Sequence, residues 1–434
     1  MSRRGWRNVA IVVTLLIGPV PVAMGFPVTG AIRVVTGLTS HTLCSQVLIT
    51  GLEADKVYAE SVRPQAGIGL LNWGIRYKVD RSLREVRTTF LGAFESRAVY
   101  RTGLGCVLGL DTAEGTPEAP FAEPGSVTGS VTGNPVLQAV IEQGLRDSKA
   151  IVIMRDGQFV GEAYAPGYNQ TSRVPGWSAS KSVINALTGI LVRGGRLSLN
   201  QRSLFAEWAN DGRREITVEH LLRMTSGLDL DETNSGFDPA ARMLFVERDM
   251  AGFAIQGPLK RLPGTKMSYT DCNTVLLSRI IRDAVGGDVT AFARRELFEP
   301  LGIRNMLIES DVKGTPIGST HIFGTARDWA RFGALYLNDG VVNGRRILPE
   351  GWVRYSSQPT LGTRYAAGFW TNVDQDQRIG MPGDSFFASG HLGQKVLIVP
   401  SKQLVIARFA VRHKSDGDMA TLRKLYAAAA ANGG

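Results

Sequence analysis

The stretch GWSASKS at residues 176–182 sets Ser178 three residues before Lys181, at the start of an apolar run that reaches Ile190. Side chains at positions i and i+3 of a helix share one face, so a helix here would place the lysine ammonium beside the serine hydroxyl. The positive end of the helix dipole lowers the cost of a neutral lysine and favours a developing oxyanion. The stretch therefore predicts a serine nucleophile with its own base at a helix N-terminus.

This spacing alone is not specific, because the chain repeats it. Ser310 and Lys313 are also three residues apart, but Asp311, Gly314 and Pro316 predict a loop there with no apolar helix after it. Three further segments give the first stretch a context that the repeat lacks. They are a helix and turn, LLRMTSGL at 221–228, a tyrosine loop, PGTKMSYTDCNT at 263–274, and the segment SGHLGQ at 389–394.

The order S-x-x-K, then tyrosine, then H-x-G resembles that of the serine β-lactamase and penicillin-binding-protein superfamily. The resemblance is to the branch of β-lactamase-related serine hydrolases that includes 6-aminohexanoate-dimer hydrolases and family VIII esterases. It covers about residues 136–431 and includes LFEPLGI at 297–303 and TARDWARFG at 325–333. It implies an α/β fold of the β-lactamase/transpeptidase type, with an antiparallel sheet flanked by helices and a helical subdomain. Strand patterns at both ends of this segment, around a helical middle, favour the same fold class.

The resemblance also implies roles for single residues. Ser178 is expected to be the nucleophile, with Lys181 and Tyr269 sharing the general-base and general-acid work. The oxyanion hole is expected to combine the Ser178 amide with an amide from the segment that contains His391 and Gly393. If the resemblance were set aside, Ser178 and Lys181 would be a helix cap and a solvated lysine, and Tyr269 a core aromatic residue.

Three other side chains leave alternatives open. His391 contributes either its side chain or only its backbone amide to the site. Asn273 either lines the substrate pocket or caps the helix that follows the tyrosine loop, and Asp271 is ambiguous in the same way.

The chain departs from the family pattern at two motifs. Asp271 stands where β-lactamases of this type usually carry asparagine, and Gly390-His391-Leu392-Gly393 stands in place of K-T-G. The missing lysine removes a cation suited to the carboxylate of a β-lactam or a D-Ala-D-Ala terminus. The sequence therefore favours an enzyme that cleaves small esters or amides. The alternatives are a D-Ala carboxypeptidase, a β-lactamase, or a penicillin-binding sensor without turnover.

Composition and spacing argue against other classes. The net charge is +10, but the basic residues are scattered among 39 acids, so we expect no nucleic-acid partner. The segment 176–180 lacks the second glycine of G-x-S-x-G, which disfavours a Ser-His-Asp hydrolase. The five histidines are dispersed without ligand spacing, so we expect no metal and no cofactor.

The N-terminus predicts export. A basic segment at 2–7 precedes an apolar segment at 9–24, so residues 1–25 form either a cleaved signal peptide or a retained membrane anchor. The remainder is expected to be extracytoplasmic, in the periplasm or the cell envelope. In an oxidising compartment Cys44 and Cys106 are expected to form a structural disulfide; two buried thiols are the alternative. Cys272, left over near the tyrosine loop, is expected to be a packed core residue.

These patterns divide the chain into four parts. After the export segment come a β-rich region at 26–111, with alternating runs such as VYAESV at 57–62, and a Gly/Pro/Ser/Thr-rich linker at 112–135. The serine hydrolase domain is expected at 136–434, with hairpins about an Asp-Gly pair at 156–157 and about 401–403. Its partner is expected to be a small-molecule ester or amide.

Overall fold

The computed structural model describes residues 25–65, 67–109, 133–233, 238–372, 380–411 and 417–431. The predicted export segment and the predicted linker lie almost wholly outside these ranges. Within them, no helix combines the length and the apolar character that crossing a membrane requires.

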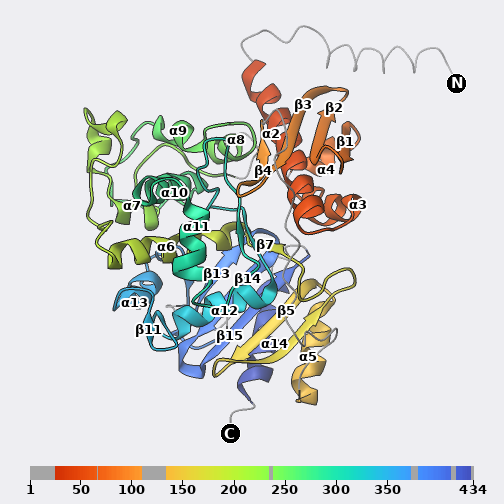
Figure 1. The fold of residues 1–434 in the computed structure, drawn as a ribbon, viewed down its shortest axis with the longest axis vertical. Helices are drawn as coiled ribbons and strands as arrows, with labels where there is room; N and C mark the ends of the chain where they lie inside the picture. The colour runs from red at the N-terminus through yellow and green to blue at the C-terminus, as the bar shows by residue number, and fades with distance from the viewer. Residues whose placement is uncertain are drawn as a thin grey trace, which may run out of the picture.

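A six-stranded antiparallel sheet forms the centre of the larger part of the molecule (Figure 1). Its strand order is β12–β13–β14–β15–β5–β6, so the last hairpin of the chain pairs with the first hairpin of this domain. Both hairpins predicted from the sequence are therefore confirmed, as is the fold class. The strands are β5 (Ser148–Arg155), β6 (Gln158–Tyr164), β12 (Trp370–Thr371), β13 (Phe386–Gly390), β14 (Gln394–Val399) and β15 (Leu404–Ala410).

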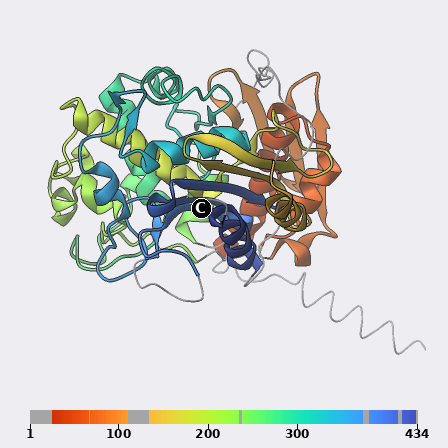
Figure 2. The same cartoon turned by 90° about the horizontal axis from the view of Figure 1, so that it is seen from below.

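Helices cover both faces of this sheet. On one face, α12 (Ala326–Leu337) packs against β14, β15 and β5. On the other, α5 (Pro135–Leu145) and α14 (Gly417–Ala430) lie against each other and against the sheet (Figure 2). Successive residues of β5 point to opposite faces of the sheet. Val152 belongs to the larger core, whereas Ile151 and Ile153 belong to the core beneath α5 and α14.

A helical subdomain lies beside the sheet. Several of its helices begin at side-chain caps, such as Asp238, Asp249 and Thr270, which satisfy free amides of the first turn. The main helices are α6 (Ser180–Arg193), α7 (Val218–Leu222), α8 (Pro239–Phe245), α9 (Met250–Ile255), α10 (Asp271–Val285), α11 (Val289–Ala293) and α13 (Trp352–Ser357). Short helical turns are η5 (Ala206–Trp208), η6 (Gly212–Glu215) and η7 (Arg294–Phe298). Small sheets are formed by β7 (Val174–Pro175), β9 (Ile322–Gly324) and β8 (Leu307–Ile308), and by β10 (Val341–Val342) and β11 (Arg345–Arg346).

The N-terminal region, predicted to be β-rich, is mixed: its first half is helical, and its strands lie in the second half. The long helix α2 (Gly25–Cys44) crosses a four-stranded antiparallel sheet, with short helical segments between them (Figure 1). These segments are η2 (Ser45–Ile49), α3 (Ala54–Val57), η3 (Tyr58–Val62) and α4 (Ile68–Leu71), and the strands are β1 (Ile75–Asp80), β2 (Glu85–Phe90), β3 (Ala93–Arg101) and β4 (Gly105–Leu108).

Residues 57–62 show why the alternation misled. A strand would bury every second residue, but the structure buries Val57, Ser61 and Val62 and exposes Ala59. This spacing of four and five residues is that of one helical face, and the ion pair between Lys56 and Glu60 supports it.

Candidate active site

Ser178 lies in a single helical turn, η4 (Trp177–Ala179), immediately before α6. Trp177 holds a left-handed backbone angle of φ 48°, which a residue with a large side chain adopts only under strain. The end of β13 presses on the same turn, since a Cβ atom on Gly390 would collide with the carbonyl oxygen of Gly176. The nucleophile predicted from the sequence therefore lies at a tightly packed turn beside the end of β13.

Lys181 lies beside Ser178, as the spacing predicts. Its Nζ donates a hydrogen bond of 3.1 Å to Ser178 Oγ and one of 3.2 Å to the carbonyl oxygen of Ser319. The side chain is buried, and its Nζ lies 4.7 Å from the centre of the Tyr269 ring. Ser178, Lys181 and Tyr269 thus come together, although about 90 residues separate the two motifs that contain them.

The charge of Lys181 differs from the sequence expectation. Its Nζ makes a buried ion pair with Oδ1 of Asp271, the first residue of α10. Burial is the largest single effect and lowers the pKa of Lys181, but the attraction of Asp271 and smaller contributions from other groups around the ammonium together raise that pKa above its ordinary value. Lys181 is therefore an ammonium at rest, and the helix dipole does not keep it neutral.

Tyr269 is a neutral phenol at rest. Burial raises the pKa of Tyr269, and this outweighs the opposing attraction of Lys181. Its ring packs against those of Tyr365 and Trp370, with centres 5.4 and 5.8 Å away. These aromatic contacts hold the phenol at the wall of the site.

Glu232 is a site residue that the sequence analysis missed. Its Oε2 accepts a hydrogen bond of 3.0 Å from the backbone amide of Asp271. Burial and the neighbouring Asp271 carboxylate raise the pKa of Glu232 to about 8, so it carries a proton at neutral pH. The available signal was the acidic run DLDE at 229–232, directly after the SGL turn.

A cavity of about 370 Å³ opens onto Ser178, Tyr269 and Asp271. Of the three residues predicted to bind the substrate or the oxyanion, only His391 lines it. His391 is exposed, and its ring lies 5.6 Å from that of Trp177.

Gly393 and Asn273 lie away from the cavity. Gly393 has φ 82° and packs so closely on Asp418 that a side chain would not fit, which explains the glycine without substrate contact. Asn273 neither lines the cavity nor caps α10, because Thr270 is the cap. Instead, its side-chain oxygen accepts a hydrogen bond of 2.8 Å from Ser226 and so ties the SGL turn to α10.

The cavity contains a cation despite the missing K-T-G lysine. Lys395 on β14 lines it and donates a hydrogen bond to Ser389 of the paired strand β13. Burial lowers the pKa of Lys395 to about 8. Lys395 directly follows the SGHLGQ segment, and the pairing of Ser389 with Lys395 between β13 and β14 places it at the cavity.

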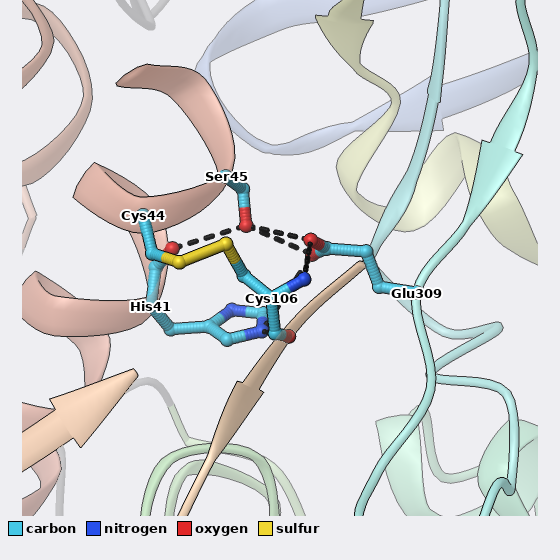
Figure 3. Close-up of a disulfide and its surroundings, with 5 residues drawn as sticks. All are labelled: His41, Cys44, Ser45, Cys106 and Glu309. Atoms are coloured by element: carbon cyan, nitrogen blue, oxygen red, sulfur yellow. Dashed lines mark hydrogen bonds and ion pairs between the residues drawn. A yellow bond between two sulfur atoms is a disulfide. The ribbon is translucent and has the colours of Figure 1, made fainter. Parts of the chain in front are cut away.

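A second buried cluster lies behind Trp177. His41, Glu309 and His321 place potential ligand atoms within 4.8 Å of one another, although the dispersed histidines predicted no metal spacing. These groups already make hydrogen bonds: His41 Nε2 lies 2.7 Å from the Cys106 carbonyl oxygen, and Glu309 Oε1 accepts from the Cys106 amide at 2.8 Å (Figure 3). Burial lowers the pKa of His41 to about 4 and raises that of Glu309 to about 8, so both are neutral at pH 7.

The disulfide predicted between Cys44 and Cys106 is present, and Cys272 is buried as expected (Figure 3). Because Cys44 ends α2 and Cys106 lies on β4, the bond fixes the end of the long helix to its own sheet.

A turn bearing Ser178 and Lys181, a tyrosine loop and the connection between β13 and β14 together form one site. The beta-lactamase family model matches residues 136–431. The chain belongs to this family. Its beta-lactamase part therefore begins at α5, and the whole N-terminal region lies outside the matched segment.

This beta-lactamase family member is similar in sequence or in structure to the following three proteins. A 6-aminohexanoate-dimer hydrolase of Paenarthrobacter ureafaciens is 26% identical over 235 residues, which cover 50% of this chain and 59% of that protein, less than two thirds of its length. A Bacillus anthracis protein provisionally assigned as a 6-aminohexanoate-dimer hydrolase has a TM-score of 0.57 at 21% identity, covering 68% of this chain and 81% of that one. A penicillin-binding protein homolog of Caulobacter crescentus has a TM-score of 0.55 at 20% identity, covering 69% and 100%. These two structures share the fold.

Proposed function

We propose that this chain is an exported serine hydrolase that cleaves small ester or amide bonds through an acyl-enzyme on Ser178. The observation that carries the proposal is the hydrogen bond of 3.1 Å from Lys181 to Ser178, beside Tyr269 and at the edge of a cavity. The relationship to a 6-aminohexanoate-dimer hydrolase supports an amide or ester as the substrate. The basic and apolar N-terminal segments and the disulfide support an extracytoplasmic location.

Proton transfer in this mechanism runs through Asp271. Because Lys181 is an ammonium at rest, it accepts the Ser178 proton only as it gives a proton of its own to the Asp271 carboxylate. Ser178 Oγ then bonds to the acyl carbon, and the resulting oxyanion is stabilised by backbone amides of the Ser178 turn and the end of β13.

The leaving group departs with a proton. Tyr269, a neutral phenol, donates it to the leaving alcohol or amine and is reprotonated by Lys181 as Asp271 returns its proton. A water molecule then attacks the acyl carbon with the same series of proton transfers, which releases the acid and restores the Ser178 hydroxyl. Each residue ends the cycle in its starting protonation state.

A penicillin-binding role, with or without turnover, is the second candidate, and Lys395 favours it. This ammonium in the cavity is suited to the carboxylate of a β-lactam or of a D-Ala-D-Ala terminus. Under this alternative a labelled penicillin acylates Ser178 more readily than p-nitrophenyl butyrate does, and a long-lived adduct identifies a sensor.

Labelling of the full chain with a fluorophosphonate tests the proposal. Mass spectrometry is expected to place the adduct on Ser178, and Lys181→Ala is expected to lower kcat for p-nitrophenyl butyrate by about 10²–10⁴-fold. Lys313→Ala is the matched control, because exposed Lys313 has the same spacing from Ser310. An adduct elsewhere, or none on folded protein, would refute the acyl-enzyme. Hydrolysis rates of nitrocefin and a linear aminohexanoate dimer then distinguish the substrate classes.

A further inference from the structure

The cavity beside Ser178 has a wall that the beta-lactamase part of the chain does not supply. Val34, Val35 and Leu38 of α2 line it, and all three precede the segment that matches the family. Residues of α8, including Leu244 and Phe245, complete an apolar lining. The N-terminal region therefore contributes residues to the candidate active site.

The sequence of α2 separates an apolar face from a polar one. Val34, Val35 and Leu38 fall on one side of the helix by the 3.6-residue period and are buried. Thr36 and Ser40 fall on the opposite side, where Thr36 Oγ1 lies 2.8 Å from Ser96 Oγ and Ser40 donates a 2.8 Å hydrogen bond to the Ser96 carbonyl oxygen. The polar contacts with β3 orient the helix, so its apolar face points to the cavity.

Several contacts fix this wall in place. A Cβ atom on Gly37 would collide with the carbonyl oxygen of Phe245, so α2 and α8 touch through backbone atoms. At the C-terminal end of α2, the disulfide holds Cys44, and the single hydroxyl hydrogen of Ser45 is shared between the Glu309 carboxyl oxygens, which lie 2.8 and 3.0 Å from Ser45 Oγ (Figure 3). Because Glu309 belongs to the matched domain, this bond joins the helix to the part that contains Ser178.

We infer that α2 forms a binding wall for an apolar chain of the substrate and thereby selects esters or amides with medium-length alkyl chains. The inference rests on the proposed function, because the bound chain belongs to the compound that Ser178 attacks. A cavity of about 370 Å³ with a preformed apolar lining is of the size that holds a small ligand. Each methylene buried against such a wall strengthens transition-state binding by about three- to fourfold.

The test compares kcat/KM for p-nitrophenyl acetate, butyrate, octanoate and decanoate on the full chain. The octanoate-to-acetate ratio is expected to exceed 10 in the wild type, because burial of only three of the six additional methylenes against the wall would raise it about 27- to 64-fold. Val35→Phe, which fills the cavity, should lower this ratio at least tenfold. Val34→Ala, which enlarges the cavity and perturbs folding less than Val35→Phe does, should shift the chain-length preference to p-nitrophenyl decanoate. The matched control is Val28→Phe on the same helix, because Val28 is 59% exposed and away from the cavity.

Two readouts separate this inference from the proposed function. If a fluorophosphonate labels Ser178 but the chain-length ratio is the same in Val35→Phe, Val34→Ala and wild type, the wall is wrong and the serine hydrolase stands. If Ser178 is not labelled, calorimetric titration of Ser178→Ala with butanoate and octanoate gives the answer without turnover. Tighter binding of octanoate that Val35→Phe abolishes supports the wall, and equal binding of the two acids overturns it.

Discussion

The carboxylate of Asp271 lies against the ammonium of Lys181, and this contact determines how a proton can leave Ser178. With the asparagine usual at this position, the strongest attraction on the lysine would be lost, and burial would lower its pKa. With aspartate, the lysine is held as an ammonium, so the pair exchanges protons internally. Glu232, protonated at neutral pH, adds no further negative charge next to the pair.

Replacing Asp271 tests this proton transfer. In Asp271→Asn the proton acceptor is lost, so kcat/KM is expected to fall about 10²-fold at pH 7. Because burial then lowers the pKa of Lys181, neutral lysine becomes available as the pH rises, and the variant is expected to recover activity between pH 7 and 10. The measurement is a pH–rate profile with p-nitrophenyl butyrate, alongside Asp283→Asn on the exposed side of the same helix. An unchanged rate and profile would exclude Asp271 from the proton path.

At the scale of secondary-structure elements, the short distance between α2 and α8 depends on Gly37. In Gly37→Ala the methyl group meets the Phe245 carbonyl oxygen and pushes the helices apart, which is expected to cost about 1–3 kcal/mol of unfolding free energy. Opening this contact also displaces the apolar wall, so hydrolysis of p-nitrophenyl octanoate should fall.

Gly30→Ala is the matched control, because nothing lies within 4 Å of the added atom on the same helix. It is expected to stabilise the protein by about 0.5–1 kcal/mol through helix propensity. Urea denaturation measures both variants, and equal stability changes at the two positions would show that the α2–α8 contact carries no strain.

The helices and strands also show which features the sequence could predict and which it could not. The two hairpins and the helix after Ser178 follow from local periodicity, which is fixed within one segment. The helical segment 57–62 was mistaken for a strand because short runs fit both periods until their burial is known. Lys395 directly follows the SGHLGQ segment, but its place at the cavity depends on the pairing of β14 with β13. The wall formed by Val34 depends on helix packing between distant segments, which no local pattern encodes.

At the scale of the whole molecule, the buried cluster of His41, Glu309 and His321 joins the N-terminal region to the beta-lactamase part. Its neutrality at pH 7 comes from burial, which lowers the pKa of both histidines and raises that of Glu309. Above pH 7, only Glu309 among these three residues changes its charge. The two histidines have already lost their protons in both the folded and the unfolded chain.

The pH dependence of stability follows from this difference. The pKa of Glu309 is about 8 in the folded protein against 4.5 for a free glutamate, so its contribution to stability is complete below about pH 4.5 and is lost as the pH rises through 8. Glu309→Gln keeps an uncharged side chain at every pH. Between pH 7 and 9 the wild type is expected to lose roughly 1–2 kcal/mol more unfolding free energy than this variant. Urea denaturation at both values measures the difference, with exposed Glu350→Gln as the control. Parallel losses in wild type and Glu309→Gln would mean that Glu309 is already ionised at neutral pH, and that the junction tolerates a buried charge.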